Sequence, residues 1–193
     1  MDATEQRQRG KVLLPLARAA IAREFGRGHA ADDAAPWLRE TGACFVTLTR
    51  QGALRGCIGT LEAHRPLLAD VRANAVAAAF RDPRFAPLSA REWENTEVEV
   101  SLLSPMQALD FDDEADALAQ LRPGFDGVVF EFGARRSTFL PQVWEQLPDA
   151  EDFMAQLKRK AGLPADFWHA QVRLQRYTVS KWKESELRLA PTA

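Results

Sequence analysis

The sequence predicts an α+β fold in which antiparallel strands are accompanied by helices of uneven length. Strands occur mainly as hairpins and single segments, which favours this class over a repeating parallel βαβ design. Within residues 96–103, the polar Glu97, Glu99 and Ser101 alternate with the apolar Val98, Val100 and Leu102, as in an antiparallel strand with one solvated face. With 193 residues, 46% of them hydrophobic, the chain can form one large domain or two packed lobes without disulfides or metals.

The first half of the chain is predicted to contain a helix, a hairpin and a second helix. Residues 11–25 have apolar positions at helical spacing, and Pro15 should begin or kink that helix. Residues 43–61 contain two β-prone runs and form the clearest local signal. Residues 66–80 predict an alanine-rich helix that ends before Asp82-Pro83, because the residue before a proline avoids helical geometry.

Capping patterns and alternation predict the second half. Ser89 and Glu92 form a capping box that opens a short helix, and Asp149 caps a helix that Gly162 closes. The other expected elements are strand 96–103, helix 112–121, strand 127–132 with its partner 137–140, and a bent final strand over 171–182.

The hairpin turn decides which side chains share a face of the sheet. A three-residue loop, Arg50-Gln51-Gly52, fits the spacing because glycine adopts positive φ without steric cost. That loop places Arg55 and Cys57 on the face opposite the core and Cys44 on the core face, which excludes a disulfide between the cysteines. A two-residue turn would shift the pairing and reverse this conclusion. The expected pairs are Leu48 with Leu54, Val46 with Gly56, Cys44 with Ile58, Thr47 with Arg55 and Phe45 with Cys57.

Charge and hydropathy argue against several classes of function. The 25 Lys and Arg residues against 27 Asp and Glu give a net charge of −2, so nucleic-acid binding is not expected beyond a local arginine patch. No apolar run approaches the roughly 20 residues of a membrane span, and none fits a signal peptide. We therefore expect a cytoplasmic protein whose two cysteines are free thiols.

Residues 54–60, Leu-Arg-Gly-Cys-Ile-Gly-Thr, are the most unusual stretch. A thiol beside a cation favours the thiolate, so Cys57 and Arg55 are candidate catalytic residues. Gly56 and Gly59 weaken a strand, and close approach of a ligand or of another backbone would explain them. The alternative is a buried cysteine beside a structural arginine, which residue type alone favours.

Further candidates lie outside this strand. Arg84 is a candidate for binding an anion, with Asp82 orienting it, or the two residues simply pair across a loop. Thr47, from the facing strand, joins the candidate ligand contacts. Glu99 would be a general base if its face lines a cleft, although a solvated face is the favoured interpretation. The three histidines, His29, His64 and His169, are far apart and show no metal-ligand spacing, so no metal site is predicted.

Five motifs follow one another along the chain: LRGCIG at 54–59, AAFRDPRFAPL at 78–88, EVEVSLLSP at 97–105, TFLPQVW at 138–144 and KAGL at 160–163. Together they resemble the AMMECR domain, whose bacterial and archaeal members are named AmmeMemoRadiSam system protein A. The resemblance covers about residues 11–185, and Pro15 departs from the usual first helix. It implies a single two-lobed domain over 1–193, with a cleft between a larger and a smaller lobe.

The resemblance also implies a pathway, with a Memo-type protein and a radical S-adenosylmethionine protein as partners, and it adds Lys160 to the residues near the functional surface. The reaction, substrate and cofactor stay open. One hypothesis is a cysteine-dependent enzyme or ligand-binding component, with Cys57 as nucleophile or attachment point, Arg55 as activating cation and Arg84 holding an anionic small molecule. The other is a non-catalytic module that docks the two partners.

Overall fold

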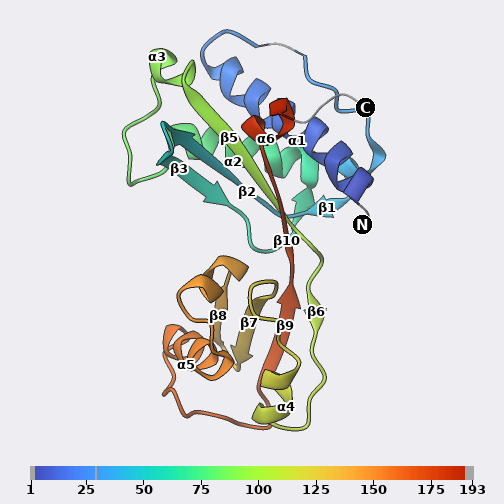
Figure 1. Ribbon diagram of the computed structural model, residues 1–193, viewed down its shortest axis with the longest axis vertical. Coiled ribbons are helices and arrows are strands. Elements are labelled where there is room, and N and C mark those ends of the chain that lie inside the picture. Colours follow the sequence, from blue (N-terminus) through green and yellow to red (C-terminus); the bar gives the residue numbers. More distant parts are fainter. Residues whose placement is uncertain (1–2, 29, 190–193) are drawn as a thin grey trace. The chain divides into compact units, whose positions relative to one another are not determined.

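The computed structural model describes residues 3–28 and 30–189, and the chain divides into two compact units. Unit 1 comprises Met1–Leu103 and Ser180–Ala193, and unit 2 comprises Ser104–Val179. Each unit combines helices with antiparallel strands, so the predicted α+β class is confirmed (Figure 1). Within the described ranges, no helix has the length and apolar character needed to cross a bilayer.

Unit 1 is built on a four-stranded sheet in the order β10-β5-β2-β3. Helices α1 and α2 pack on one face of this sheet, where Val46, Leu48, Val98 and Val100 are fully buried (Figure 1). Its elements are α1 (Ala3–Glu24), the 3-10 helix η1 (Pro36–Arg39), β1 (Thr41–Gly42), β2 (Cys44–Arg50), β3 (Ala53–Gly59), β4 (Arg65–Pro66), α2 (Leu67–Phe80), α3 (Ala90–Trp93), β5 (Thr96–Leu103), β10 (Val179–Lys183) and α6 (Glu184–Leu189).

Helix α1 is longer than the sequence pattern predicts. It begins at Ala3 rather than near residue 11 and continues through Pro15, which therefore does not start it. The side chains of Leu13, Leu16 and Ile21 are buried against the core, whereas Pro15 lies on the exposed side. The residues before 11 are polar helix formers with few apolar positions, so apolar spacing alone could not detect them.

The hairpin of β2 and β3 differs from the predicted register. Gln51 and Gly52 have φ values of 53° and 79°, so the turn has two left-handed residues rather than a three-residue loop. Arg50 pairs with Ala53, but the register then shifts, and Thr47 pairs with Cys57. One residue of β3 is left over in this shift and forms a β-bulge at Arg55.

The bulge restores the predicted face of Cys57, which the two-residue turn alone would have reversed. Leu54, before the bulge, pairs with Thr49 and so lies on the exposed face rather than on the predicted core face. Cys57 lies opposite Thr47, on the face that points away from the helices, while Cys44 is fully buried on the core side. Both cysteines are free, as expected. All five predicted pairs are wrong, because Thr47 pairs with Cys57, Leu48 with Gly56, Val46 with Ile58 and Phe45 with Gly59. The predicted separation of the two cysteines is nevertheless correct.

A buried polar network joins α2 to the start of β2. The Asp70 carboxylate is completely buried and accepts hydrogen bonds from Cys44 N at 2.9 Å and from Arg65 Nε at 2.8 Å. Thr60 Oγ1 donates to the same carboxylate at 2.7 Å, and the Asn74 amide donates to the Cys44 carbonyl at 2.9 Å. These contacts satisfy main-chain groups at the point where β2 enters the core.

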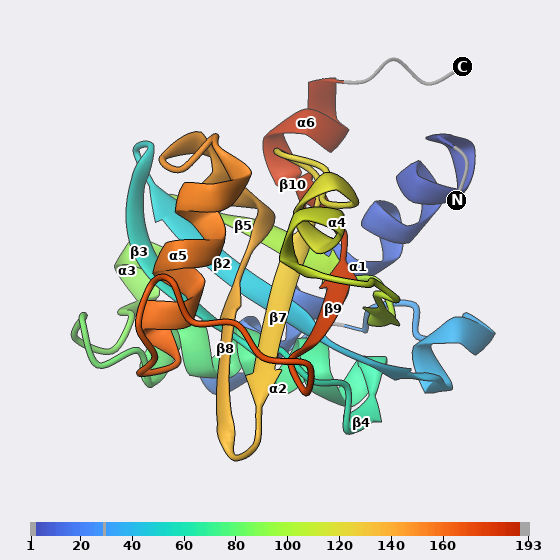
Figure 2. The same cartoon turned by 90° about the horizontal axis from the view of Figure 1, so that it is seen from below.

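Unit 2 has a second four-stranded sheet in the order β6-β9-β7-β8, with α5 packed beside the β7–β8 hairpin (Figure 2). Phe130, Leu174 and the α5 residues Phe153 and Leu157 are buried in its core. Its elements are β6 (Gln107–Ala108), α4 (Glu114–Ala119), β7 (Gly127–Phe132), β8 (Arg135–Phe139), the 3-10 helix η2 (Pro141–Glu145), α5 (Ala150–Lys160) and β9 (Arg173–Tyr177).

Removing the Asp70 carboxylate should destabilise unit 1. Asp70→Ala leaves the Cys44 N–H buried without its acceptor, so we expect the free energy of unfolding to fall by about 2 kcal/mol in urea titrations. The control is Asp33→Ala, which breaks the half-exposed ion pair with Arg72 and should cost less than about 1 kcal/mol. Equal losses in the two variants would contradict the role given to the network.

Candidate functional site

Three candidate residues form a row across the face of the unit 1 sheet that the helices leave uncovered. Cys57 on β3 pairs with Thr47 on β2, and Thr47 pairs with Glu99 on β5. Their side chains therefore project from the same face. All three are half-buried, whereas the alternate residues of β2 are fully buried beneath the helices. The sheet itself thus brings a thiol, a hydroxyl and a carboxylate together.

Cys57 is the accessible thiol of the protein. Its Sγ accepts a hydrogen bond from Thr47 Oγ1 at 3.2 Å. Cys44, in contrast, is fully buried, and burial together with the charge of Asp70 raises the pKa of its thiol well above the ordinary value. We therefore expect electrophilic reagents to react with Cys57 rather than with Cys44, because Cys57 is the more exposed thiol.

Lys183 on β10 extends the row beyond Glu99. The distance between Lys183 Nζ and Glu99 Oε2 is 3.5 Å, and the side chains are 45% and 15% exposed. Sequence reasoning did not select this lysine, although the pattern around it contained a signal. Lys181 and Lys183 are exposed on either side of the buried Trp182, which is the alternation of a half-buried strand.

The Arg55 guanidinium group is engaged by Glu92. Its Nε and Nη2 donate to the two carboxylate oxygens of Glu92 at 3.2 and 3.3 Å, and Nη2 also donates to the Ala86 carbonyl at 2.9 Å. Glu92 is at the same time the acceptor of the predicted capping box with Ser89, which the structure confirms. The hydrogen bond from Arg55, followed by those from Ser89, lowers the pKa of Glu92 to about 2.

Asp82 and Arg84 bind the main chain of Cys57 from the side. Asp82 Oδ2 accepts from Cys57 N at 2.8 Å, and Arg84 Nη2 donates to the Cys57 carbonyl at 3.2 Å. The two side chains are joined by a fork, with Arg84 Nε and Nη2 at 2.9 and 2.6 Å from the carboxylate oxygens. This fork holds the pKa of the Asp82 carboxyl well below its usual range.

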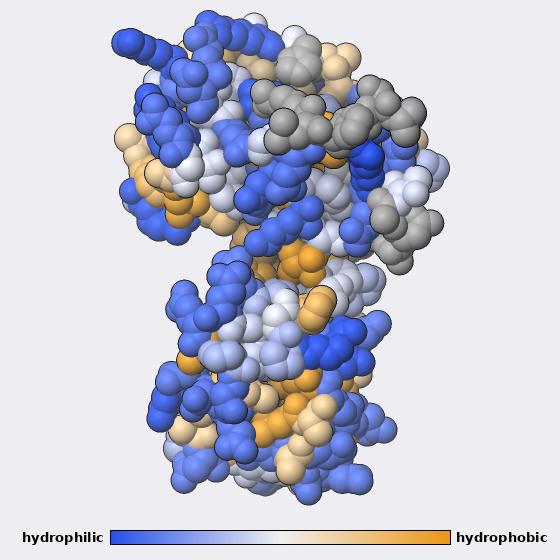
Figure 3. All heavy atoms as spheres, in the orientation of Figure 1, coloured by the Kyte–Doolittle hydropathy of each residue, from blue (hydrophilic) through white to orange (hydrophobic). Residues whose placement is uncertain are grey.

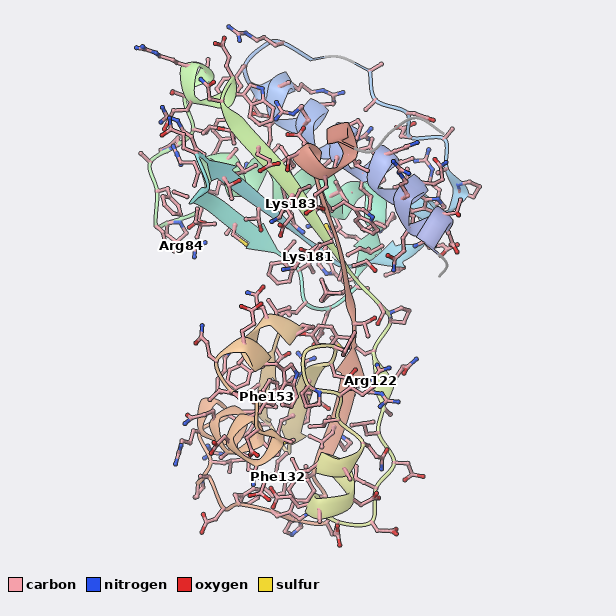
Figure 4. All side chains as sticks on the ribbon, in the orientation of Figure 1. Arg84, Arg122, Phe132, Phe153, Lys181 and Lys183 are labelled. Atoms are coloured by element: carbon pink, nitrogen blue, oxygen red, sulfur yellow. The ribbon has the colours of Figure 1, made fainter. Side chains whose placement is uncertain are left out.

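Arg84 is a positively charged group that interacts directly with Cys57. Its pKa is raised above the ordinary value mainly by hydrogen bonds to Asp82, with smaller contributions from Cys57. The Arg84 side chain is 53% exposed, whereas that of Arg55 is 13% exposed and engaged with Glu92. Figure 4 shows Arg84 at the margin of unit 1, in the segment that follows α2.

Packing explains both strand glycines. A Cβ on Gly56 would overlap the carbonyl oxygen of Ala78, so its absence lets helix α2 approach the sheet closely. A Cβ on Gly59 would overlap the ring of Phe45. The sequence left two explanations for these glycines, close approach of a ligand or of another backbone. The structure shows that other parts of the chain approach both glycines closely.

Lys160 lies in unit 2, where its Nζ donates to the Thr138 carbonyl at 2.9 Å, so it is not part of the row in unit 1. His29 falls outside the described residues. Among the residues that the structure does describe, no group of three or more His, Cys, Asp or Glu side chains is arranged to hold a metal ion.

Glu92 should make stability depend on pH. Its folded pKa of about 2 lies below the ordinary value of 4.5, so its stabilising contribution is fully present above about pH 5 and is lost as the pH falls toward 2. Glu92→Gln should therefore be less stable than the parent at pH 7, and this difference should shrink steadily below pH 5 in urea titrations. A difference that is constant with pH would contradict the ion pair.

Comparison with known proteins places the chain among proteins with the same fold. Residues 14–182 match the AMMECR1 family. A protein of Methanothermobacter thermautotrophicus is 38% identical over 184 residues, which cover 92% of this chain and 95% of that protein. One of Sulfurisphaera tokodaii is 39% identical over 190 residues, covering 92% and 83%. The crystal structure of the uncharacterized protein PH0010 from Pyrococcus horikoshii matches with a TM-score of 0.74 and 34% identity, covering 91% of each chain. The chain therefore belongs to the AMMECR1 family.

Proposed function

We propose that the chain is a ligand-binding or catalytic component whose functional surface is the helix-free face of the unit 1 sheet, with Cys57 as its reactive group. The observation that carries this proposal is the row of Cys57, Thr47 and Glu99 across three neighbouring strands. A row fixed by strand pairing is held more rigidly than one built on loops. Cys57 is partly exposed, so a reactant has access to it.

Each member of the row has a distinct role in this proposal. Thr47 donates a hydrogen bond to Sγ and so stabilises the sulfur as it gains negative charge. In the covalent step the S–H bond breaks, the sulfur lone pair forms a bond to an electrophilic carbon, and the leaving group departs with its bonding electrons. Glu99 lies two strands away, about 10 Å between Cα atoms, so it would receive the thiol proton through water rather than directly.

Arg84 and Lys183 suit an anionic small molecule as the ligand. Arg84 uses Nε and Nη2 on Asp82 and on the Cys57 carbonyl, which leaves Nη1 on the opposite side of its guanidinium group. Lys183 stands at the other end of the row, next to Glu99. Both cations are close to half-exposed, so a carboxylate or phosphate group can reach them.

Alkylation tests the role of Cys57. We expect iodoacetamide at neutral pH to modify Cys57 several times faster than free glutathione and far faster than Cys44, as located by peptide mass spectrometry. Arg84→Gln should lower the rate of the anionic reagent iodoacetate relative to that of iodoacetamide, because an exposed cation beside the thiol attracts the anionic reagent and not the neutral one. The matched control is Arg81→Gln, another exposed arginine in the same segment. A rate no greater than that of glutathione would contradict the nucleophile.

A docking role is the second candidate, with the Memo-type and radical S-adenosylmethionine proteins as the proposed partners. Leu54 on β3 is 44% exposed, and apolar atoms gather near β3 and the segment after α2 in Figure 3. The centroid of the Phe85 ring is 5.7 Å from Arg55 Cζ and 5.6 Å from Arg84 Cζ. Aromatic and arginine side chains are common at protein interfaces.

Copurification separates the two candidate functions. If the chain only docks, capture of the two partners should survive Cys57→Ala and be lost with Arg55→Ala or Arg84→Ala. If the thiol performs chemistry, Cys57→Ser should abolish pathway output while capture of the partners is retained. If these variants retain both the capture of the partners and the pathway output, this surface has neither role.

A further inference from the structure

The unit 1 sheet ends at β3, and a strand at the end of a sheet exposes unpaired main-chain groups. Such an edge can pair with a strand from another molecule. In an antiparallel ladder, alternate residues direct their N–H and C=O groups away from the neighbouring strand. Cys57 is one of these residues, because its N–H and its carbonyl bind side chains beyond the edge rather than β2.

Asp82 and Arg84 occupy the place of a neighbouring strand at Cys57. The carboxylate of Asp82 replaces a strand carbonyl as acceptor, and the guanidinium of Arg84 replaces a strand N–H as donor. The fork between them fixes their relative position, and Arg84 N donates to Asp82 Oδ1 at 3.1 Å, which closes the turn. Asp82 is only 4% exposed, although it lies in a loop. We call these two residues the edge cap.

Other features of unit 1 indicate that its sheet edges are protected in different ways. The opposite edge strand, β10, carries Lys181 and Lys183 at exposed positions, and charged lysines disfavour pairing with another chain (Figure 4). β3 carries no lysine and exposes Leu54 instead. Its own protection consists of the bulge at Arg55 and the edge cap at Cys57.

We propose that the edge cap keeps β3 from pairing with β3 of a second copy of this chain, and that its removal lets two copies join into a dimer with a continuous sheet. An antiparallel pairing of β3 with itself is self-complementary about a two-fold axis, as a closed dimer requires. The cap acts on main-chain groups that every sequence shares. It therefore blocks pairing without depending on the side chains of a partner.

The test is the oligomeric state of the Asp82→Ala/Arg84→Ala double variant. Light scattering during size-exclusion chromatography should give a dimer for the variant at concentrations where the parent chain is monomeric. Hydrogen exchange of residues 53–59 in the variant should become slower as the dimer forms. Adding Leu54→Lys to the double variant should restore the monomer, because a lysine then lies on the edge strand.

The matched control removes a comparable ion pair away from the edge. Asp33→Ala/Arg72→Ala breaks a 2.9 Å pair between the segment before η1 and helix α2, and this variant should stay monomeric. A double variant of the cap that is folded by circular dichroism and monomeric at all concentrations would overturn the proposal. So would a parent chain that already pairs through β3. If the double variant does not fold, Arg84→Ala alone frees the Cys57 carbonyl and allows the same comparison.

This test is independent of the chemistry proposed for Cys57. Dimer formation is measured without any thiol reagent, and Cys57→Ser keeps the main-chain groups that the cap binds. The Cys57→Ser variant should be monomeric. If Cys57 proves unreactive, the proposal about the edge cap is unaffected. If the cap variant stays monomeric, the proposal about Cys57 reactivity is unaffected.

Discussion

The burial of one face of β2 is the constraint on which the arrangement of unit 1 depends. Cys44, Val46 and Leu48 are completely excluded from solvent beneath the helices, so the residues between them must face the other way. Thr47 is therefore fixed on the open face, and strand pairing places Cys57 and Glu99 on either side of it. The candidate site is thus a consequence of core packing, because moving β2 by one residue would exchange its two faces.

The parts of the fold that sequence predicts well are those with strong local signals. The strand predicted over 96–103 has the bounds of β5, and the strand predicted over 127–132 has those of β7. The bend expected in the final strand appears as a break between β9 and β10 at Thr178. Alternation and capping depend on neighbouring residues, so one sequence is enough to recognise them.

The parts that sequence missed depend on contacts between distant residues. The bulge at Arg55 changes the hairpin register, and the residues of the turn do not predict it. Glu92 was recognised as a cap for its own helix, but its ion pair with Arg55 joins residues far apart in the chain. The proximity of Lys183 to Glu99 likewise requires knowing that β10 lies beside β5. The sequence therefore allowed the residues of the candidate site to be predicted, but not the residues that they contact.

The connectivity of unit 1 has a consequence for how the chain can fold. β5 and β10 are neighbours in one sheet, yet residues 104–178, which are all of unit 2 except Val179, lie between them in sequence. Where the chain leaves and returns, Ser104 N donates to the Thr178 carbonyl at 2.9 Å, and Thr178 N donates to Ser104 Oγ at 3.0 Å. During synthesis the sheet stays incomplete until unit 2 has been made, so early folding of that insertion would shorten the loop to be closed and reduce its entropic cost.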